Sequence, residues 1–371
     1  MNCSTPSATP LKPHRSHKKS QQKNVNPGKP ETPTNRPFIK KEQHIQSLRD
    51  QSLREVVVDK FPAAAPTFPQ QTPTSPQQAS TSPQAPKSMS EAEKYWNHYA
   101  GEYDDEIASS IDEDNGTIKK LLRAASNQLM LDRNASNQDQ DQGKQVIVCD
   151  YGCGPGYWIQ TLSNVFEKWN GHGFDVSIVG LDISQKLVDL ARKKLPKVRV
   201  EQANLEKLAE VQQALRIESG PVSFGVCANV LIAPSVSSRN KILTSIRATT
   251  RTGSIIVFVV PSLESALYCE WRWLKSGPAI ENMDDDAIPH ETGEDANNIL
   301  TGCLPRDDVR TKHWIREEFE QTLRMNGFQM MQCEKAEYGW NMEFSEGDIP
   351  LHMQTPGPGP WDWCVVAEKT M

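Results

Sequence analysis

Apolar and polar positions along this chain follow two periods between Gln145 and Pro261. Short apolar runs of strand length alternate there with segments whose apolar residues recur at helical spacing. Such alternation is typical of a parallel sheet covered by helices on both faces. The strands are expected at VIVCDYG, VSIVGLDIS, VRVEQANL, VSFGVCANV and SIIVFVVP, and the helices at about 157–169, 185–195, near 209 and at 239–250.

The alternation pauses after Pro261. Residues 262–312 contain an aromatic, helix-like stretch, SLESALYCEWRWLKSG, and then an acidic segment that reads as an irregular loop. A helix, HWIREEFEQTLRMNGF, and two strands, QMMQCEKAEYGW and WDWCVVAEK, follow. The two strands are joined by a Pro/Gly loop without a helix, which predicts an antiparallel end to the sheet. The fold class is therefore α/β and Rossmann-like, with a mostly parallel seven-stranded sheet that ends in an antiparallel C-terminal hairpin.

The N-terminal part has a different composition. Residues 1–89 are rich in Pro, Ser, Thr, Gln and Lys, and 61–89 are punctuated by proline, which is typical of a disordered tail and a semi-extended linker. Ser90 and Glu93 have capping-box spacing, so we place the start of the folded domain, 90–371, there. Within 90–144 we expect two helices, SEAEKYWNHYAGEYDDEI and a second over 117–131.

Charge divides the chain at the same place. Residues 1–89 hold 13 Lys and Arg against 5 Asp and Glu, whereas the remainder holds 28 against 42. Because the domain after residue 89 is acidic, it is a poor partner for the phosphate backbone of a nucleic acid. We therefore expect this domain to bind no nucleic acid. The basic tail could contact nucleic acid or an anionic surface, but a solvated extension is favoured.

Targeting and redox signals are few. No apolar run approaches the ~20 residues that span a bilayer, and we expect no membrane association. The first thirty residues have the composition of an organelle transit peptide, a look that any disordered basic tail shares. The 8 Cys are scattered without a CxxC pair, so we expect no metal site and an intracellular, cytoplasmic setting.

A glycine-rich stretch, VCDYGCGPGYW, carries the strongest chemical signal. Asp150 ends the first expected strand, and Gly152, Gly154 and Gly156 follow at alternate positions. Glycines here allow a tight turn and close approach to a ligand, and the following helix offers its N–H groups to an anionic group. A dinucleotide fingerprint reads GxGxxG, whereas here the third glycine comes one residue early. This spacing favours a ligand without a pyrophosphate.

Polar residues follow the next three strands at corresponding positions. Asp182 ends the second strand, where a carboxylate is placed to accept ribose hydroxyls. Asn204 follows the third strand and Asn229 the fourth. Because the carboxyl ends of parallel strands share one edge, these side chains are expected to face one crevice.

These motifs resemble those of class I S-adenosylmethionine-dependent methyltransferases, over residues 145–260 and the C-terminal hairpin. The resemblance implies that the DYGCGPG glycines pack against the methionine part of S-adenosyl-L-methionine. It implies that Asp182 holds the ribose and that Ile183 lies beside the adenine. Asn204 and Leu205 fall where the family usually has an acid for the adenine amino group, and Asn229 falls where an Asp is common. Tyr95, Tyr99 and Tyr103 resemble the family's tyrosine-rich helical lid.

Each of these residues also has a purely structural interpretation. Asp182 could cap the next helix, although Ser184 is better placed for that. Asn204 and Asn229 are common turn formers. The tyrosines of the first helix could pack it onto the body. Tyr268, Trp271 and Trp273 could pack on the sheet or could shape an acceptor pocket in the 262–312 insertion.

The acceptor and the catalytic group are not indicated by any motif. The sulfonium of the cofactor is a good leaving group, so positioning and a dry pocket matter more than a base. His313, Tyr268 and His290 are weak candidates for that base. An acidic body with aromatic inserts favours a small or peptide acceptor, cationic or aromatic. The alternatives are a protein methyltransferase recruited by its tail, a catalytically silent scaffold and a nicotinamide dehydrogenase. The sequence does not indicate the oligomeric state.

Overall fold

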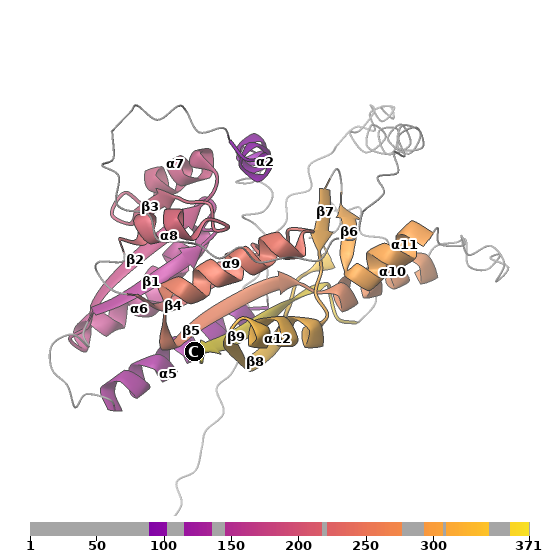
Figure 1. The fold of residues 1–371 in the computed structure, drawn as a ribbon. Helices are drawn as coiled ribbons and strands as arrows, with labels where there is room; N and C mark the ends of the chain where they lie inside the picture. Colours follow the sequence, from indigo (N-terminus) through magenta and orange to yellow (C-terminus); the bar gives the residue numbers. More distant parts are fainter. Residues whose placement is uncertain are drawn as a thin grey trace, which may run out of the picture. The chain divides into compact units, whose positions relative to one another are not determined.

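The structure, a computed structural model, describes residues 89–101, 115–135, 145–216, 221–276, 293–306, 309–340 and 357–370. The expected disordered tail therefore lies outside the described residues, apart from Met89. The described part is an α/β fold built on one large sheet (Figure 1).

The sheet has seven strands in the order β3-β2-β1-β4-β5-β9-β8. The first five in sequence are parallel, and β9 runs antiparallel to both β5 and β8, as the Pro/Gly connection predicts. The strands are β1 (Gln145–Tyr151), β2 (Asp175–Asp182), β3 (Arg199–Gln202), β4 (Val222–Ala228), β5 (Thr250–Pro261), β8 (Phe328–Glu337) and β9 (Trp361–Lys369).

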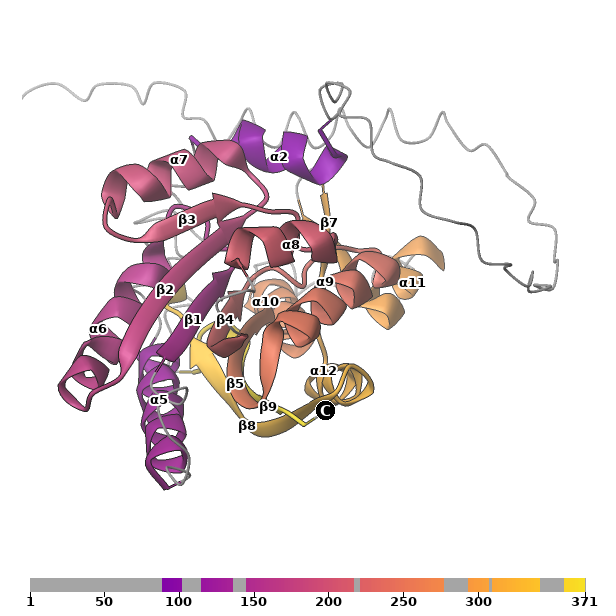
Figure 2. The ribbon, with the colours of Figure 1, turned by 60° about the vertical axis from the view of Figure 1, so that its left-hand side comes forward.

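Helices cover both faces of this sheet (Figure 2). On one face lie α5 (Thr117–Ala135), α6 (Tyr157–Gly171) and α7 (Gln185–Lys194), and on the other α8 (Leu208–Leu215), α9 (Val236–Thr249) and α12 (Arg316–Met325). Side chains of β1 point alternately to the two faces of the sheet. Val146 and Val148 pack with α5 and α6, whereas Ile147 and Cys149 belong to the core that also contains residues of α8, α9 and α12. The strands are thus buried on both faces, as their near-continuous apolar runs predict.

The region after β5 holds more regular structure than the sequence indicates. The aromatic stretch forms α10 (Leu263–Ser276) as expected. Where an irregular loop is expected, the structure has α11 (Gly293–Thr301) and a hairpin of β6 (Cys303–Arg306) and β7 (Val309–Lys312). Each strand of this hairpin has only four residues, and β6 contains Pro305, which is uncommon inside a strand. Strands this short do not show an alternation of period two, so the sequence pattern misses them.

The N-terminal helix α2 (Glu91–Tyr99) begins as the capping box predicts, because the Ser90 side chain accepts from the backbone N–H of Glu93 at 3.2 Å. Among the described residues, no helix is long and apolar enough to cross a membrane. The same residues contain no group of three or more potential ligands that could hold a metal ion.

Candidate functional site

The strand order reverses at β1, and this reversal locates the candidate site. From β1 the chain builds the sheet outward through β2 and β3, then crosses to β4 and β5 on the other side. A crevice forms outside the carboxyl ends of the strands at such a switch point. The loops after β1, β2, β3 and β4 all lie at this edge, and they carry the predicted site residues of the sheet.

The loop after β1, residues 152–156, is held against the end of β2 by its backbone. The N–H groups of Gly152 and Cys153 both donate to the carbonyl of Leu181, at 2.7 and 2.8 Å. All three glycines have positive φ, and Gly156 is the N-cap of α6 with no side chain capping that helix. The predicted strand–glycine turn–helix is therefore confirmed as a local structure.

A side chain on this loop would have no room. A Cβ added to Gly152 would lie 2.2 Å from Cγ2 of Val230, the residue two beyond the end of β4. A Cβ on Gly156 would lie 2.8 Å from Cδ1 of Leu195, after α7. Glycine is thus required by packing as well as by backbone conformation, and the loop forms a backbone-lined cradle between β2 and β4.

Asp182 connects the two strongest sequence signals. One of its carboxylate oxygens accepts from the backbone N–H of Gly154 at 2.9 Å, and the other accepts from that of Ser184 at 2.8 Å. Ser184, and not Asp182, is the N-cap of α7. Burial raises the pKa of Asp182 to about 6, against the opposing effect of these backbone hydrogen bonds. Each oxygen keeps a second lone pair, so the carboxylate can still accept ligand hydroxyls.

Asp150 is fully buried, and neither of its carboxylate oxygens has a hydrogen-bond partner among the described residues. Burial, and then the nearby charge of Asp182, raises the pKa of Asp150 to about 8. A buried acceptor without a donor is rare in native proteins and indicates a missing partner. Burial also raises the pKa of the neighbouring Cys153 thiol, which argues against a thiolate nucleophile beside the loop.

The two predicted asparagines lie at the same edge but differ in their roles. The side-chain carbonyl of Asn204 accepts from the N–H of Glu206 at 2.9 Å, so this residue forms the turn after β3. Its neighbour Leu205 is buried in the core. Asn229 is exposed, has φ of 54° and donates its backbone N–H to Val259 at 2.9 Å. Asn tolerates this left-handed conformation better than most residues.

The helix α2 lies over the loop after β2 (Figure 2). The Asn97 side-chain oxygen accepts from the Ser184 hydroxyl at 2.8 Å and from the backbone N–H of Lys186 at 3.2 Å. Gln202 donates to Glu93 at 2.9 Å and to the carbonyl of Ile183 at 3.0 Å. The sequence gives no signal for Asn97, because its partners are almost ninety positions away.

Tyr99 is half-buried on α2, with its ring centroid 4.6 Å from that of Tyr95. Tyr103 lies outside the described residues. The hydrogen bonds between α2 and the loop after β2 run through the side chain of Asn97, and a lid role for the tyrosines stays a prediction.

The candidates for a base lie further along the edge. His313 is buried, with Nδ1 3.0 Å from the carbonyl of Thr311. The Tyr268 hydroxyl donates to the carbonyl of Pro358 at 3.0 Å and accepts from Arg272 at 3.3 Å. His290 and the side chain of Trp273 lie outside the described residues. These contacts tie both described candidates to the chain after β5 and not to the glycine loop, so a catalytic role for them stays a prediction.

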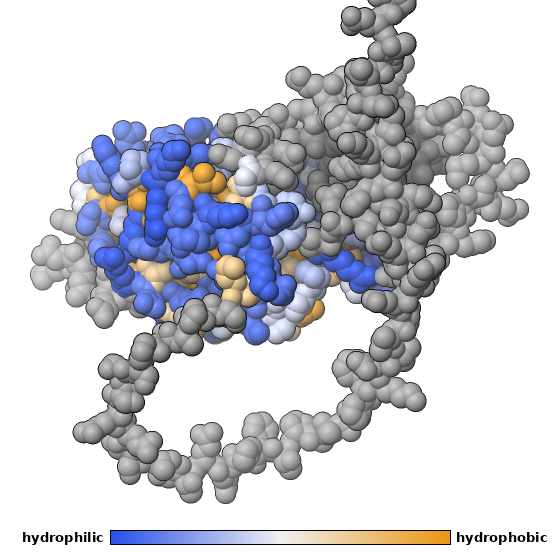
Figure 3. Space-filling view, turned by 90° about the horizontal axis from the view of Figure 1, so that it is seen from above, coloured by the Kyte–Doolittle hydropathy of each residue, from blue (hydrophilic) through white to orange (hydrophobic). Residues whose placement is uncertain are grey.

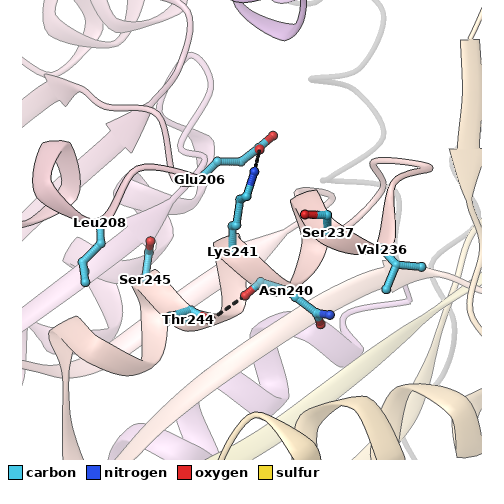
Figure 4. Close-up of a pocket in the computed structure, with 8 residues that line it drawn as sticks. All are labelled: Glu206, Leu208, Val236, Ser237, Asn240, Lys241, Thr244 and Ser245. Atoms are coloured by element: carbon cyan, nitrogen blue, oxygen red, sulfur yellow. Dashed lines mark hydrogen bonds and ion pairs between the residues drawn. The ribbon is translucent and has the colours of Figure 1, made fainter. Parts of the chain in front are cut away.

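An open hollow lies beside this edge, between the loop after β3 and the outer face of α9 (Figure 4). Glu206 and Lys241 form an ion pair across it at 3.8 Å, and neither is fully buried. None of its lining residues is a predicted site residue; they are Glu206, Leu208, Val236, Ser237, Asn240, Lys241, Thr244 and Ser245.

Comparisons with known proteins place these features in a family. A family model described as a methyltransferase domain matches residues 142–346. No curated protein matches the chain.

Solved structures with a similar fold share little sequence with this chain. Magnesium protoporphyrin IX methyltransferase from Synechocystis PCC 6803, with bound SAH, is 13% identical, with a TM-score of 0.41, covering 75% of this chain and 98% of that one. A SAM-dependent methyltransferase from Anabaena variabilis has 13% identity, a TM-score of 0.43 and coverages of 75% and 95%. One from Methanosarcina mazei has 15% identity, a TM-score of 0.38 and coverages of 64% and 97%.

Proposed function

This chain belongs to the methyltransferase-domain family, in the class I group whose cofactor is S-adenosylmethionine, and we propose that it methylates a small-molecule or peptide acceptor. The proposal draws most on Asp150, whose buried carboxylate lacks any donor beside the glycine loop. A cationic amine such as the α-ammonium of the cofactor would supply that donor and offset the cost of burying the charge.

The residues at the crevice fit the parts of this cofactor. The glycine loop lets a ligand approach its backbone closely, because its three glycines carry no side chain that would stand between the two. Asp182 is oriented by two backbone N–H groups and retains lone pairs for the ribose hydroxyls. We assign Ile183 and Leu205 to the adenine and its surroundings, with Asn204 and Asn229 as secondary contacts. Tyr99 and Tyr103 are proposed as lid residues.

When bound, S-adenosylmethionine supplies a methyl group attached to a sulfonium sulfur. The lone pair of the acceptor attacks the methyl carbon in line with the carbon–sulfur bond, which breaks and leaves its electron pair on the sulfur. The chain then has to orient the two reactants and exclude water. The Asn97 side chain contacts the loop after β2, and Glu93 contacts Gln202 at the end of β3, which supports a lid role for α2 over the crevice. A base is needed only for a protonated or weakly nucleophilic acceptor, and His313, Tyr268 and His290 remain candidates for that role.

The test is the formation of S-adenosylhomocysteine by the full-length protein, measured over a panel of small molecules and peptides. Turnover that is abolished in Asp182→Ala, and kept in an exposed control such as Asp189→Ala, would support the proposal. Binding of the cofactor without turnover on any acceptor would favour a catalytically silent scaffold. Turnover on proteins only, lost on removal of residues 1–89, would favour a protein methyltransferase recruited by its tail.

A further inference from the structure

A second unpartnered group lies at the carboxyl edge of the sheet. In the described part of the chain, buried side-chain atoms without a hydrogen-bond partner belong to Asp150, Trp169, Arg199 and Trp361. Trp169 lies in the last turn of α6 and Arg199 begins β3, so both lie toward the opposite edge. Trp361 begins β9, which is antiparallel to β5, so it lies at the ligand edge. The residue is 7% exposed, and its indole N–H has no acceptor among the residues that the structure describes.

Trp361 is part of an aromatic cluster, which we define as Tyr268, Trp271, Trp340 and Trp361. The Tyr268 ring centroid lies 5.6 Å from that of Trp361, 6.1 Å from that of Trp340 and 6.2 Å from that of Trp271. The planes of Tyr268 and Trp271 are 26° apart, and Trp271 is 53% exposed. A stack that ends in an exposed ring offers a flat apolar surface to a planar ligand.

The charges on this cluster are positive at the ring faces. Lys335 Nζ lies 3.7 Å from the ring centroid of Trp361, and Arg272 Cζ lies 5.5 Å from that of Trp340. Because these faces already bear cations, a cationic ligand would meet like charge. The nearby carboxylate of Glu264 accepts from Trp363 at 3.2 Å, and that of Asp362 accepts from Tyr338 at 3.0 Å. Both carboxylates keep their charge, so the preference for an anionic aromatic ligand rests on the Trp361 N–H, which has no acceptor among the described residues, and on the two cations that lie against the rings.

The sheet register relates this cluster to the glycine loop. Asp150 is level with Val226, Val257 and Val366 across three neighbouring strands. Trp361 lies five residues beyond Val366 toward the ligand edge, or roughly 16 Å at about 3.3 Å per residue. Strands β5 and β9 thus extend past the glycine loop (Figure 1). The aromatic cluster stands on this extension, at a distance that suits a part of the acceptor remote from its reacting atom.

We propose that the aromatic cluster is a specificity subsite for an aromatic carboxylate group of the acceptor. The ring stacks on the cluster, the carboxylate accepts from the Trp361 Nε1–H, and Lys335 and Arg272 provide the complementary charge. This subsite rests on the proposed function, since it names the class of acceptor for the same crevice.

The test uses the full-length protein with 15N-labelled tryptophan, whose nine indole N–H signals are resolved by NMR. Trp361→Phe assigns the Trp361 signal. We expect 2-naphthoate to move that signal downfield in a saturable way, because the N–H gains an acceptor. Lys335→Gln should weaken binding of 2-naphthoate about tenfold, whereas Lys193→Gln, a matched change on exposed α7, should not.

Two control probes separate the contributions of charge and ring. Cyclohexanecarboxylate lacks the flat ring and 2-naphthylmethylammonium reverses the charge, so both should bind at least tenfold more weakly. An unmoved Trp361 signal at millimolar 2-naphthoate, or equal binding of the cationic probe, would overturn the proposal. S-adenosylmethionine binding is measured on the same samples by thermal shift. Cofactor binding without a 2-naphthoate response refutes the subsite alone, and the converse result refutes the proposed function.

Discussion

The carboxylate of Asp182 and the backbone N–H of Gly154 are joined by a hydrogen bond of 2.9 Å. The bond links the end of β2 to the glycine loop after β1, so the residue proposed to hold the ribose also fixes the loop proposed to hold the methionine part. The second carboxylate oxygen of Asp182 accepts from the backbone N–H of Ser184, and Ser184 caps α7 and contacts Asn97 of α2. One carboxylate thus couples three segments of the crevice.

Replacing Asp182 by Asn should weaken both the fold and cofactor binding. An amide has only one acceptor oxygen, so one of the two backbone N–H groups would face an N–H₂ donor instead. We expect a loss of about 2 kcal/mol in the free energy of unfolding at pH 7. Cofactor affinity should fall about 100-fold. Urea unfolding and titration calorimetry measure the two effects. Asp189→Asn on the exposed face of α7 is the control, and an equal effect there would refute this role of Asp182.

Gly152→Ala should destabilise the protein mainly through the clash with Val230. Its φ is +82°, and so is that of Gly116, where an added Cβ would meet nothing within 4 Å. Gly116→Ala therefore measures the conformational cost alone, about 1–2 kcal/mol. Gly152→Ala should cost at least ~1 kcal/mol more by overpacking. Val230→Ala should recover part of that excess. Equal costs at the two glycines in chemical denaturation would contradict the packing argument.

The pKa of Asp150 makes cofactor binding dependent on pH. In the free protein this group is largely protonated at pH 7, because burial raises its pKa to about 8. Binding of an ammonium group requires the carboxylate, so affinity should rise almost tenfold per pH unit from pH 6.5 to 7.5. A proton should be released on binding, which calorimetry in buffers of different ionisation enthalpy detects. Asp150→Asn should abolish this slope.

The same group has the opposite effect on the stability of the free protein. A carboxyl whose folded pKa is raised stabilises the fold fully below its unfolded pKa, about 4, and this contribution is lost as pH rises through about 8. The free energy of unfolding without cofactor should therefore decrease between pH 5 and 8 more steeply in the wild type than in Asp150→Asn. A wild-type slope no steeper than that of the variant would exclude a raised pKa for Asp150.

The β6–β7 hairpin is held by a buried ammonium. Lys312 is 1% exposed, and its Nζ lies 2.6 Å from a carboxylate oxygen of Glu318 and 2.9 Å from the carbonyl of Thr301. Glu318→Gln would leave this charge without its counter-ion, and because Glu318 is half-exposed we expect a cost of about 1–3 kcal/mol. The control is Glu317→Gln, whose side chain is 72% exposed. Thermal unfolding of the two variants should separate them, and indistinguishable midpoints would contradict this view.

Local chemistry explains which features the sequence predicts. The glycine turn, the acid at the end of β2 and the α2 capping box depend on residues close together in the chain, so their patterns are visible. The contact of Gly152 with Val230 and that of Asn97 with Ser184 depend on the topology of the sheet, and single-residue patterns do not encode them. The β6–β7 hairpin that ends at Lys312 is short and charged, so it has no strand pattern. The aromatic cluster brings together residues of α10, β9 and the chain after β8, which are far apart in the sequence.

Surface composition gives little further guidance. The face in Figure 3 is largely hydrophilic where its residues are described, with small hydrophobic areas between hydrophilic residues. The informative residues are instead the buried polar ones, Asp150 and Trp361, because each has an unmet hydrogen-bonding requirement at the ligand edge.

Titration calorimetry of the full-length protein with S-adenosylmethionine, and separately with NADH, shows which of the two the crevice binds. We predict a single site of micromolar affinity for S-adenosylmethionine, lost in Asp182→Ala and Gly154→Trp, and no binding of NADH. A folded sample that gives no heat and no thermal shift with millimolar S-adenosylmethionine would show that the protein does not bind this cofactor.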